Sequence, residues 1–314
     1  MNGAYMKVVA SIAILFSVAI FSGIGAQVKI AQKPTGQFRS ITIISEPNSN
    51  VWIDGVLFGK TKADGSLEIR TISSGTHSIR LRADGFKEQN QTLTATQKGN
   101  VNISLTKTTD KAELAFQEAE RMGSVDREKA VAAYKQAIAL KPKYPEAFLA
   151  LARTQAGMGD LEDALKSIIA ARKLRPSYAE ASAVEARIHK EFGESEKAIA
   201  TFKRAINEGK GFQPEAYTGL GLIYKEKAEA LGSGGDFEVE ATANAESTKN
   251  LRLSIKQLSG APDAMVIYQM LGLIFERMKK NDDAIATYEE FLTVFPDSVE
   301  ATAVRSFIVQ LKKQ

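Results

Sequence analysis

The sequence predicts an α+β multidomain protein in which a small antiparallel β-sandwich precedes an all-α superhelix. Two observations carry this prediction. Short runs of alternating apolar and polar residues, separated by glycines, occupy residues 40–106. From about residue 111 the alternation stops, and one apolar pattern recurs every 34 residues. The 314 residues leave room for two ordinary domains, and 44% hydrophobic with 25% charged residues is a globular composition.

The N-terminal segment, residues 1–26, has the layout of a secretory signal. Lys7 precedes an apolar run that begins at Val8, and small residues follow up to Ala26. This layout predicts cleavage after Ala26 and export to the periplasm, the cell envelope or the medium. An uncleaved membrane anchor stays open as the alternative, because residues 8–26 are 19 residues without charge, which just reaches spanning length. Residues 27–39 read as a short polar linker.

The β region starts near Ser40, where the apolar period becomes two. Its first clear turn is Asp54-Gly55, a dipeptide typical of two-residue hairpins. Further alternating runs follow, separated by glycines, and together they predict a small antiparallel sandwich or barrel. The side chains expected to face its core are Ile53, Leu67, Ile69, Ile79, Leu81, Leu93, Val101 and Ile103.

Three segments of this region carry a family resemblance. They are S-x-P at 45–47, V-W-I-D-G-V-L-F-G-K-T at 51–61 and S-G-T-H-S-I-R-L-R-A-D-G-F at 74–86. In this order they resemble a PEGA domain over about residues 40–106. Two departures are Asn48-Ser49-Asn50 after Pro47, where Glu-Gly-Ala is expected, and Lys62 in place of a proline after Thr61. The resemblance implies an exported or cell-surface protein with a β module of the carbohydrate- or surface-binding kind, and it transfers no binding residue.

Two features of the β region invite a functional interpretation. Trp52 and Phe58 are candidates for a surface or sugar contact, since aromatic rings stack on sugars, but Trp52 is more often a cap on the small core. His77 has no neighbouring nucleophile or metal ligand in the sequence, so we expect it to close a turn or to bond a neighbouring strand.

The helical region repeats itself with small residues in phase. Similar segments start at Glu128, Glu162 and Glu196, with 34 residues between successive starts, and a fourth starts at Asp282. Alanines and glycines at fixed places let paired helices approach closely, and stacking then buries the apolar face that a single pair cannot bury. The pattern resembles the tetratricopeptide repeat (TPR) over about residues 111–298. It predicts five repeats, at 111–144, 145–178, 179–213, 214–264 and 265–298, and residues 299–314 as a capping helix.

The fourth repeat is 17 residues longer than the 34-residue unit. The excess lies around residues 230–247 and contains Ser233-Gly234-Gly235. Two interpretations stay open for it. It is either a partner-binding loop or an extended helix hairpin with a loose tip.

Such an array curves and presents an inner surface formed by the first helix of each pair. The phase of the repeat predicts which side chains face solvent there. These candidate partner-binding residues are Leu149, Arg153, Arg187, Lys190, Thr218, Leu222, Lys225, Gln269 and Leu273. Four cations among aliphatic side chains suit an acidic peptide or protein. The alternative is an ordinary mixed surface, with the cations neutralised by nearby glutamates at 146, 180 and 215.

Several classes of function have no support in the residues. The chain has no cysteine and two histidines, which argues against thiolate and histidine-cluster metal sites. No phosphate-binding or catalytic motif occurs, so we expect neither an enzyme nor a cofactor. The net charge of +4 is not concentrated in a run, so we expect no nucleic-acid partner, and membrane contact only through an uncleaved leader.

The leading hypothesis is therefore an exported, non-catalytic scaffold. Its TPR array binds a protein or peptide partner, and its PEGA-like domain contacts envelope material. The rival hypothesis is a carbohydrate- or cell-wall-binding surface protein in which the β domain recognises the ligand and the repeats serve as a spacer.

Overall fold

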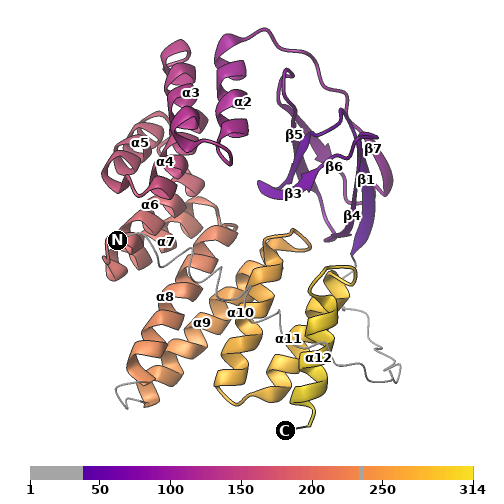
Figure 1. Cartoon of the computed structure of the whole chain (residues 1–314), viewed down its shortest axis with the longest axis vertical. Coiled ribbons are helices and arrows are strands. Elements are labelled where there is room, and N and C mark those ends of the chain that lie inside the picture. Colours follow the sequence, from indigo (N-terminus) through magenta and orange to yellow (C-terminus); the bar gives the residue numbers. More distant parts are fainter. Residues whose placement is uncertain (1–37, 233–236, 314) are drawn as a thin grey trace.

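The computed structural model describes residues 38–232 and 237–313. Two small sheets form an N-terminal β domain, and eleven helices follow it among these residues (Figure 1). This arrangement confirms the predicted β-then-α architecture. The predicted leader at 1–26 and all but the end of the predicted linker at 27–39 lie outside the described residues.

Seven strands build the β domain. They are β1 (Arg39–Ile44), β2 (Asn50–Ile53), β3 (Val56–Lys60), β4 (Ser66–Ile72), β5 (His77–Arg82), β6 (Gln89–Leu93) and β7 (Gly99–Asn102). One sheet has the strand order β4-β1-β7 and the other β3-β2-β5-β6. The Asp54-Gly55 turn joins β2 to β3, and both of its residues have positive φ, as expected from a two-residue hairpin.

The core of the β domain lies between the two sheets. Of the eight side chains predicted to face it, seven are at most 4% exposed, and Leu67 is half-buried. Ile41, Ile43 and Val51 complete the core. One strand pair departs from the predicted antiparallel arrangement, since β7 pairs with β1 in parallel. The second sheet is built between these two strands in the sequence, so a long connection brings β7 back in the same direction as β1.

The helices follow the 34-residue spacing. They are α2 (Lys111–Met122), α3 (Arg127–Leu140), α4 (Pro145–Met158), α5 (Leu161–Leu174), α6 (Ala179–Glu191), α7 (Ser195–Glu208), α8 (Pro214–Gly232), α9 (Phe237–Leu258), α10 (Ala264–Arg277), α11 (Asn281–Val294) and α12 (Ala301–Leu311). Local signals set several ends. The Asp110 and Asp126 carboxylates accept backbone N–H bonds at the starts of α2 and α3, and Gly159 ends α4 in the left-handed conformation.

The long fourth repeat is a helix hairpin. The helices α8 and α9 run 19 and 22 residues, so most of the extra sequence around 230–247 continues them. This finding supports the second of the two interpretations of that segment. After α11, the helix α12 occupies Ala301–Leu311, and the capping role expected of residues 299–314 stays a prediction.

Close helix contacts depend on residues that lack a side chain. A Cβ atom at Gly219 would lie 2.1 Å from the ring of Phe202, and one at Gly272 would lie 2.3 Å from the ring of Tyr288. These glycines therefore admit the aromatic ring of a neighbouring helix. Among the described residues, no helix combines the length and apolar character that a membrane crossing requires.

We expect Gly219→Ala to lower the free energy of unfolding by about 1–3 kcal/mol, since the new methyl group overpacks against Phe202. The matched substitution is Gly157→Ala, also in a helix, where the Cβ meets nothing closer than 3.7 Å. It should raise stability by up to about 1 kcal/mol, because alanine favours helix. Urea unfolding followed by circular dichroism measures both, and equal effects of the two substitutions would contradict the packing argument.

Candidate functional site

The nine residues predicted for the inner surface lie on α4, α6, α8 and α10, which are the first helices of their pairs. Contacts of α6 with both α4 and α8 make these helices neighbours in the array. Three helices of the set thus form one continuous wall, and the structure brings its four cations onto that wall together with carboxylates.

A three-residue ion network connects three repeats. Arg153 Nη2 lies 2.6 Å from Glu215 Oε2, and Arg187 Nη1 lies 3.4 Å from Glu215 Oε1. Burial would raise the pKa of Glu215, but the two guanidinium groups outweigh it and hold the pKa below its usual value. Glu215 is therefore an anion at neutral pH, and it neutralises part of the predicted basic surface.

The two lysines of the set also have carboxylate partners. Lys190 Nζ lies 2.8 Å from Glu226 Oε1, and Lys225 Nζ lies 2.7 Å from Glu229 Oε1. Glu229 further contacts Arg277. Each of the four cations is thus paired within the chain, as on an ordinary mixed surface. Of the three glutamates suggested as neutralising residues, only Glu215 pairs with a cation of this set, whereas Glu146 pairs with Arg175 and Glu180 forms no ion pair among the described residues.

The uncharged members of the set differ in exposure. Leu149 was expected to face solvent, and this is wrong, because it is 8% exposed and packs in the cluster that joins α4 to α5 and α6. Thr218 bonds the Ser254 hydroxyl at 2.7 Å. Leu222 is half-buried against the C-terminal cluster and Gln269 is half-exposed, while Leu273 is 45% exposed.

The aromatic candidates of the β domain lie in different environments. Trp52 lies under the guanidinium of Arg80, which is 4.3 Å from the ring centroid. Phe58 packs against both the β-domain core and the cluster of the last helices. The surface contact suggested for these two residues stays a prediction. His77 bonds the Asp54 carboxylate at 2.6 Å and the Ser73 carbonyl at 3.0 Å, so it ties β5 to the hairpin turn.

The β domain packs on the helices at two places, and no sequence pattern indicates either of them. At the first junction, Arg82 is 6% exposed and donates to Glu120 of α2 and to Glu88, at 2.5 Å each. Its guanidinium also lies 4.6 Å from the ring centroid of Phe116. Burial raises the pKa of Glu120 in spite of Arg82. Gln117 adds bonds to the backbone of the loop after β5.

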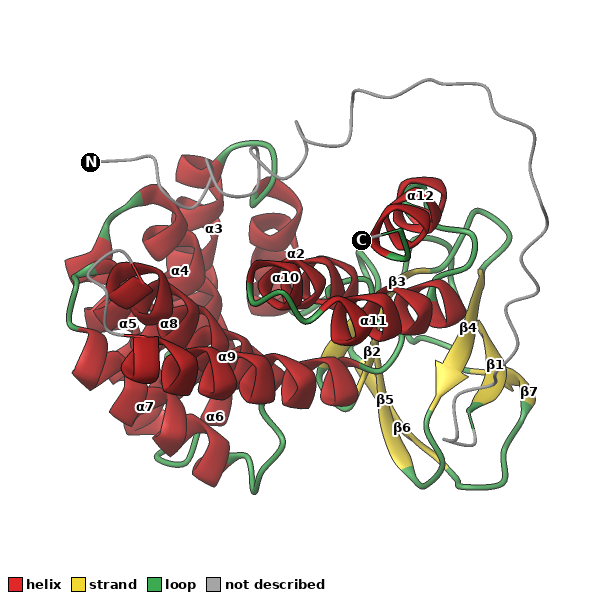
Figure 2. Cartoon of the chain, turned by 90° about the horizontal axis from the view of Figure 1, so that it is seen from below, coloured by secondary structure: helices red, strands yellow, loops and turns green. Residues whose placement is uncertain are grey.

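The second junction joins the β domain to the last repeats. The Ser259 hydroxyl donates to the Thr71 carbonyl at 2.6 Å, and Arg70 pairs with Asp297 at 2.8 Å. Val56 of β3 is buried in the cluster that α9 to α12 form. The β strands accordingly lie beside the last helices as well as near α2, so the domain connects the two ends of the curved array (Figure 2).

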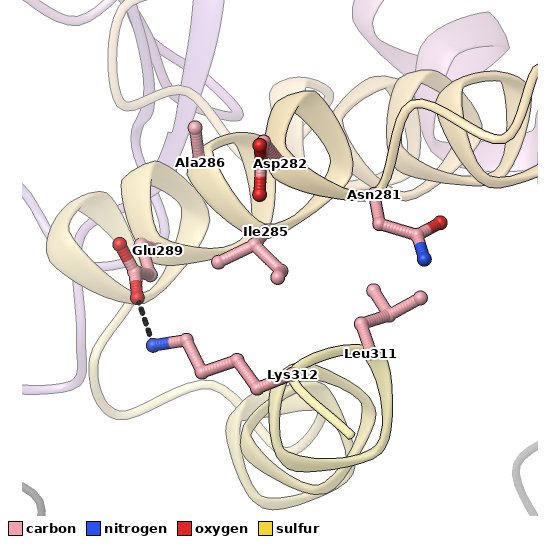
Figure 3. Close-up of a pocket in the computed structure, with 7 residues that line it drawn as sticks. All are labelled: Asn281, Asp282, Ile285, Ala286, Glu289, Leu311 and Lys312. Atoms are coloured by element: carbon pink, nitrogen blue, oxygen red, sulfur yellow. Dashed lines mark hydrogen bonds and ion pairs between the residues drawn. The ribbon is translucent and has the colours of Figure 1, made fainter. Parts of the chain in front are cut away.

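One cavity lies at the first junction, and another lies between the last two helices. One, of about 450 Å³, lies between the four-stranded sheet and the starts of α4 and α6. The other, of about 440 Å³, is a shallow site between α11 and α12, where Lys312 pairs with Glu289 across the opening and Ile285 and Leu311 face each other (Figure 3). In the described part of the chain, no group of three or more histidine, aspartate or glutamate side chains is placed to hold a metal ion.

The comparisons with known proteins agree with this architecture. Residues 38–109 match the PEGA domain, and residues 122–188 and 268–298 match models of the tetratricopeptide repeat. The chain thus contains a PEGA domain followed by tetratricopeptide repeats. No curated protein shows significant sequence similarity to the whole chain.

Solved structures share the helical fold. Yeast Tom70 aligns with a TM-score of 0.51 and 15% identity over 66% of this chain and 41% of its own. A thermophilic TPR protein of Thermus thermophilus aligns with a TM-score of 0.46 and 19% identity over 65% of this chain and 100% of its own. The MamA protein gives 0.42 and 21%, over 62% and 96%. At these identities the likeness concerns the fold alone.

We expect the stability of the protein to depend on pH through Glu215. Its lowered pKa means that the ionised carboxylate stabilises the folded state above about pH 4.3, and this contribution is lost as the pH falls through the folded-state pKa. Thermal unfolding of Glu215→Gln between pH 6 and pH 3 should show a stability gap from the wild type that closes on acidification. The control, Glu226→Gln, removes a carboxylate that is 55% exposed and should give a smaller gap throughout. A gap for Glu215→Gln that does not change with pH would contradict the assignment.

The second junction offers a further test. A Cβ atom at Gly260 would lie 1.5 Å from Thr71 Oγ1, so Gly260→Val should push the β domain away from the last repeats. The chain has no cysteine, and spin labels at Lys60→Cys and Val299→Cys would report the separation. We expect a longer and broader distance distribution for Gly260→Val, and an unchanged one for Gly157→Val. An unchanged distribution in both would show that the junction does not hold the domain.

Proposed function

We propose that this protein is an exported, non-catalytic scaffold whose inner TPR surface binds a protein partner. TPR arrays are typically scaffolds for protein–protein interaction, and TPR and PEGA domains are generally non-catalytic. The observation that carries the proposal is the continuous wall of α4, α6 and α8, with α10 beyond it. It combines charged, polar and aliphatic side chains, and both ends of the array contact one β domain.

The charge on this wall limits the kind of partner. Four cations face the three carboxylates of Glu215, Glu226 and Glu229, so most of the positive charge is already neutralised. An acidic partner must therefore displace these glutamates from the cations. We infer a partner that combines acidic side chains with an apolar contact, for which Leu273 is the most exposed aliphatic residue of the set.

Export is the second part of the proposal, and it rests on the leader sequence at residues 1–26. Cleavage after Ala26 places the mature N-terminus at Gln27. Intact-mass measurement of protein from the envelope fraction of the producing cells tests this directly. The full-length mass in the membrane fraction would instead favour the uncleaved anchor.

The rival function, recognition of cell-wall or surface carbohydrate by the β domain, has less support. The strand that carries Trp52 belongs to the sheet that faces α2 through Arg82, and Arg80 covers one face of the Trp52 ring. Phe58 is engaged with the last helices. Neither ring therefore offers both faces to a sugar.

The partner-binding proposal predicts that Leu273→Asp abolishes capture of the partner. The change introduces a charge at an apolar contact, while a side chain that is 45% exposed leaves little packing to lose. The measurement is crosslinking and quantitative mass spectrometry of proteins retained by the purified chain from cell extract. The matched control is Ile169→Asp on α5, a second helix of its pair, at a residue that is 66% exposed.

The two variants distinguish the outcomes. A protein retained by the wild type and by Ile169→Asp, but lost from Leu273→Asp, identifies a partner of the inner surface. Equal retention by all three proteins would place the contact elsewhere on the chain. Retention by none of them, together with retention of the chain on insoluble cell-wall material, would favour the carbohydrate-binding rival.

A further inference from the structure

The larger cavity has an organised charge pattern that the inner surface does not use. Its lining comes from the outer side of the four-stranded sheet and from the segments that lead into α4 and α6. None of the nine inner-surface residues lines it. At about 450 Å³, it has the volume of a site for a small ligand or a short peptide, and it lies between two domains, where such sites are common.

Two groups of side chains, 34 positions apart, contribute the same three side-chain types to this cavity, and each group spans the boundary between two successive repeats. Lys141, Tyr144 and Glu146 form the first group, and Arg175, Tyr178 and Glu180 form the second. In each group the cation lies over the tyrosine ring, at 4.2 Å for Lys141 and 4.3 Å for Arg175. Both tyrosines are buried, so the rings support the cations and are themselves not free to stack on a ligand.

The two groups are connected by an ion pair. Arg175 of the second group bonds Glu146 of the first. The pattern cannot continue in either direction. In the repeat pattern, a partner for Lys141 would stand 34 positions before Glu146, but that residue is Ala112. A partner for Glu180 would stand 34 positions after Arg175, but that residue is Gly209.

The row therefore ends in two unmatched charges of opposite sign. Among the described residues, neither Lys141 nor Glu180 forms an ion pair, and Arg153 and Arg175 attract Glu180 only from a longer distance. Both side chains are exposed and line the same cavity. Lys141 follows the end of α3, and Glu180 lies in the first turn of α6.

The opposite wall of the cavity offers hydrogen bonding with little net charge. Arg80 lies 3.7 Å from Glu88, so these two largely cancel. Ser78 and Asn90 also line this wall, and Asn90 belongs to β6, the edge strand of its sheet. Next to it, Arg82 keeps one buried donor, Nε, without a hydrogen-bond partner in the described structure.

We propose that this cavity binds an extended peptide segment that carries one acidic and one basic side chain. The acidic group pairs with Lys141 and the basic group with Glu180, each meeting a charge that the chain leaves unmatched. The polar side chains of Ser78 and Asn90 bond the peptide backbone. Lys141 and Glu180 occupy fixed places. The site therefore distinguishes a peptide from a second peptide in which the acidic and the basic residue are exchanged.

The test uses three fluorescein-labelled probes and the purified chain. The probes are Asp-Ser-Thr-Ser-Lys-amide, its charge-reversed form Lys-Ser-Thr-Ser-Asp-amide, and a neutral peptide with serine at both charged places, each labelled on its N-terminal amine. In an extended peptide the two charged side chains share one face and lie about 13 Å apart at the backbone. Fluorescence anisotropy should show one charged probe bound about tenfold more tightly than the other two.

Single substitutions test the two assigned charges. Lys141→Glu and Glu180→Lys should each reduce the affinity for the preferred probe about tenfold. The matched controls are Lys143→Glu and Glu191→Lys, which make the same charge changes at exposed residues outside the cavity and should leave the affinity unchanged. If a control lost as much affinity for the preferred probe as its matched cavity variant, the proposal would be overturned.

The double variant Lys141→Glu/Glu180→Lys provides the sharper result, because loss of folding cannot imitate it. It should bind the probe that the wild type rejects and reject the one that the wild type prefers. Equal binding of the three probes by the wild type, or an unchanged preference in the double variant, would refute the site. None of these outcomes bears on the inner surface, which Leu273→Asp tests separately.

Discussion

The arrangement of the two domains depends on the ion pairs that the buried guanidinium of Arg82 forms. Arg82 is 6% exposed, and it bonds Glu88 of its own domain and Glu120 of the first helix. Removing such a group from water costs several kcal/mol, which only well-placed carboxylates can offset. Since those carboxylates come from both domains, the ion cluster has its partners only when sheet and helix meet in one orientation. The apolar contact of Phe116 alone would not be so selective.

This first junction has a consequence at the other end of the array. With the sheet held on α2, the hairpin of β2 and β3 reaches the last repeats, where Val56 is buried and Ser259 bonds Thr71. Stacked repeats contact only their neighbours, so an open array can flex by small rotations that add up along its length. A domain attached at both ends restricts this motion. The inner surface is thereby given one curvature, which reduces the ordering cost when a partner binds.

Local and periodic features of this protein could be read from the sequence, whereas contacts between distant segments could not. The Asp54-Gly55 hairpin and the 34-residue helix spacing depend on neighbouring residues and repeat within the chain. The Arg82–Glu120 pair joins residues 38 positions apart, the Arg70–Asp297 pair 227, and neither leaves a periodic signal. For Leu149, the phase of the repeat predicted solvent exposure, but the side chain is buried. Ala183, 34 positions later, is also buried, because this position packs against the following repeat and does not face the inner surface.

The inner surface and the cavity beside the sheet differ in whether their charges are already paired within the chain. Along the inner surface each predicted cation has a carboxylate partner, so long-range attraction of an acidic partner is weak and shape must contribute much of the selectivity. In the cavity beside the sheet, by contrast, the row of paired charges ends in Lys141 and Glu180 because Ala112 and Gly209 interrupt the repeat. A departure from the repeat thus creates unmatched charge at two fixed places. A ligand that supplies the two missing charges forms ion pairs there without first breaking any within the protein.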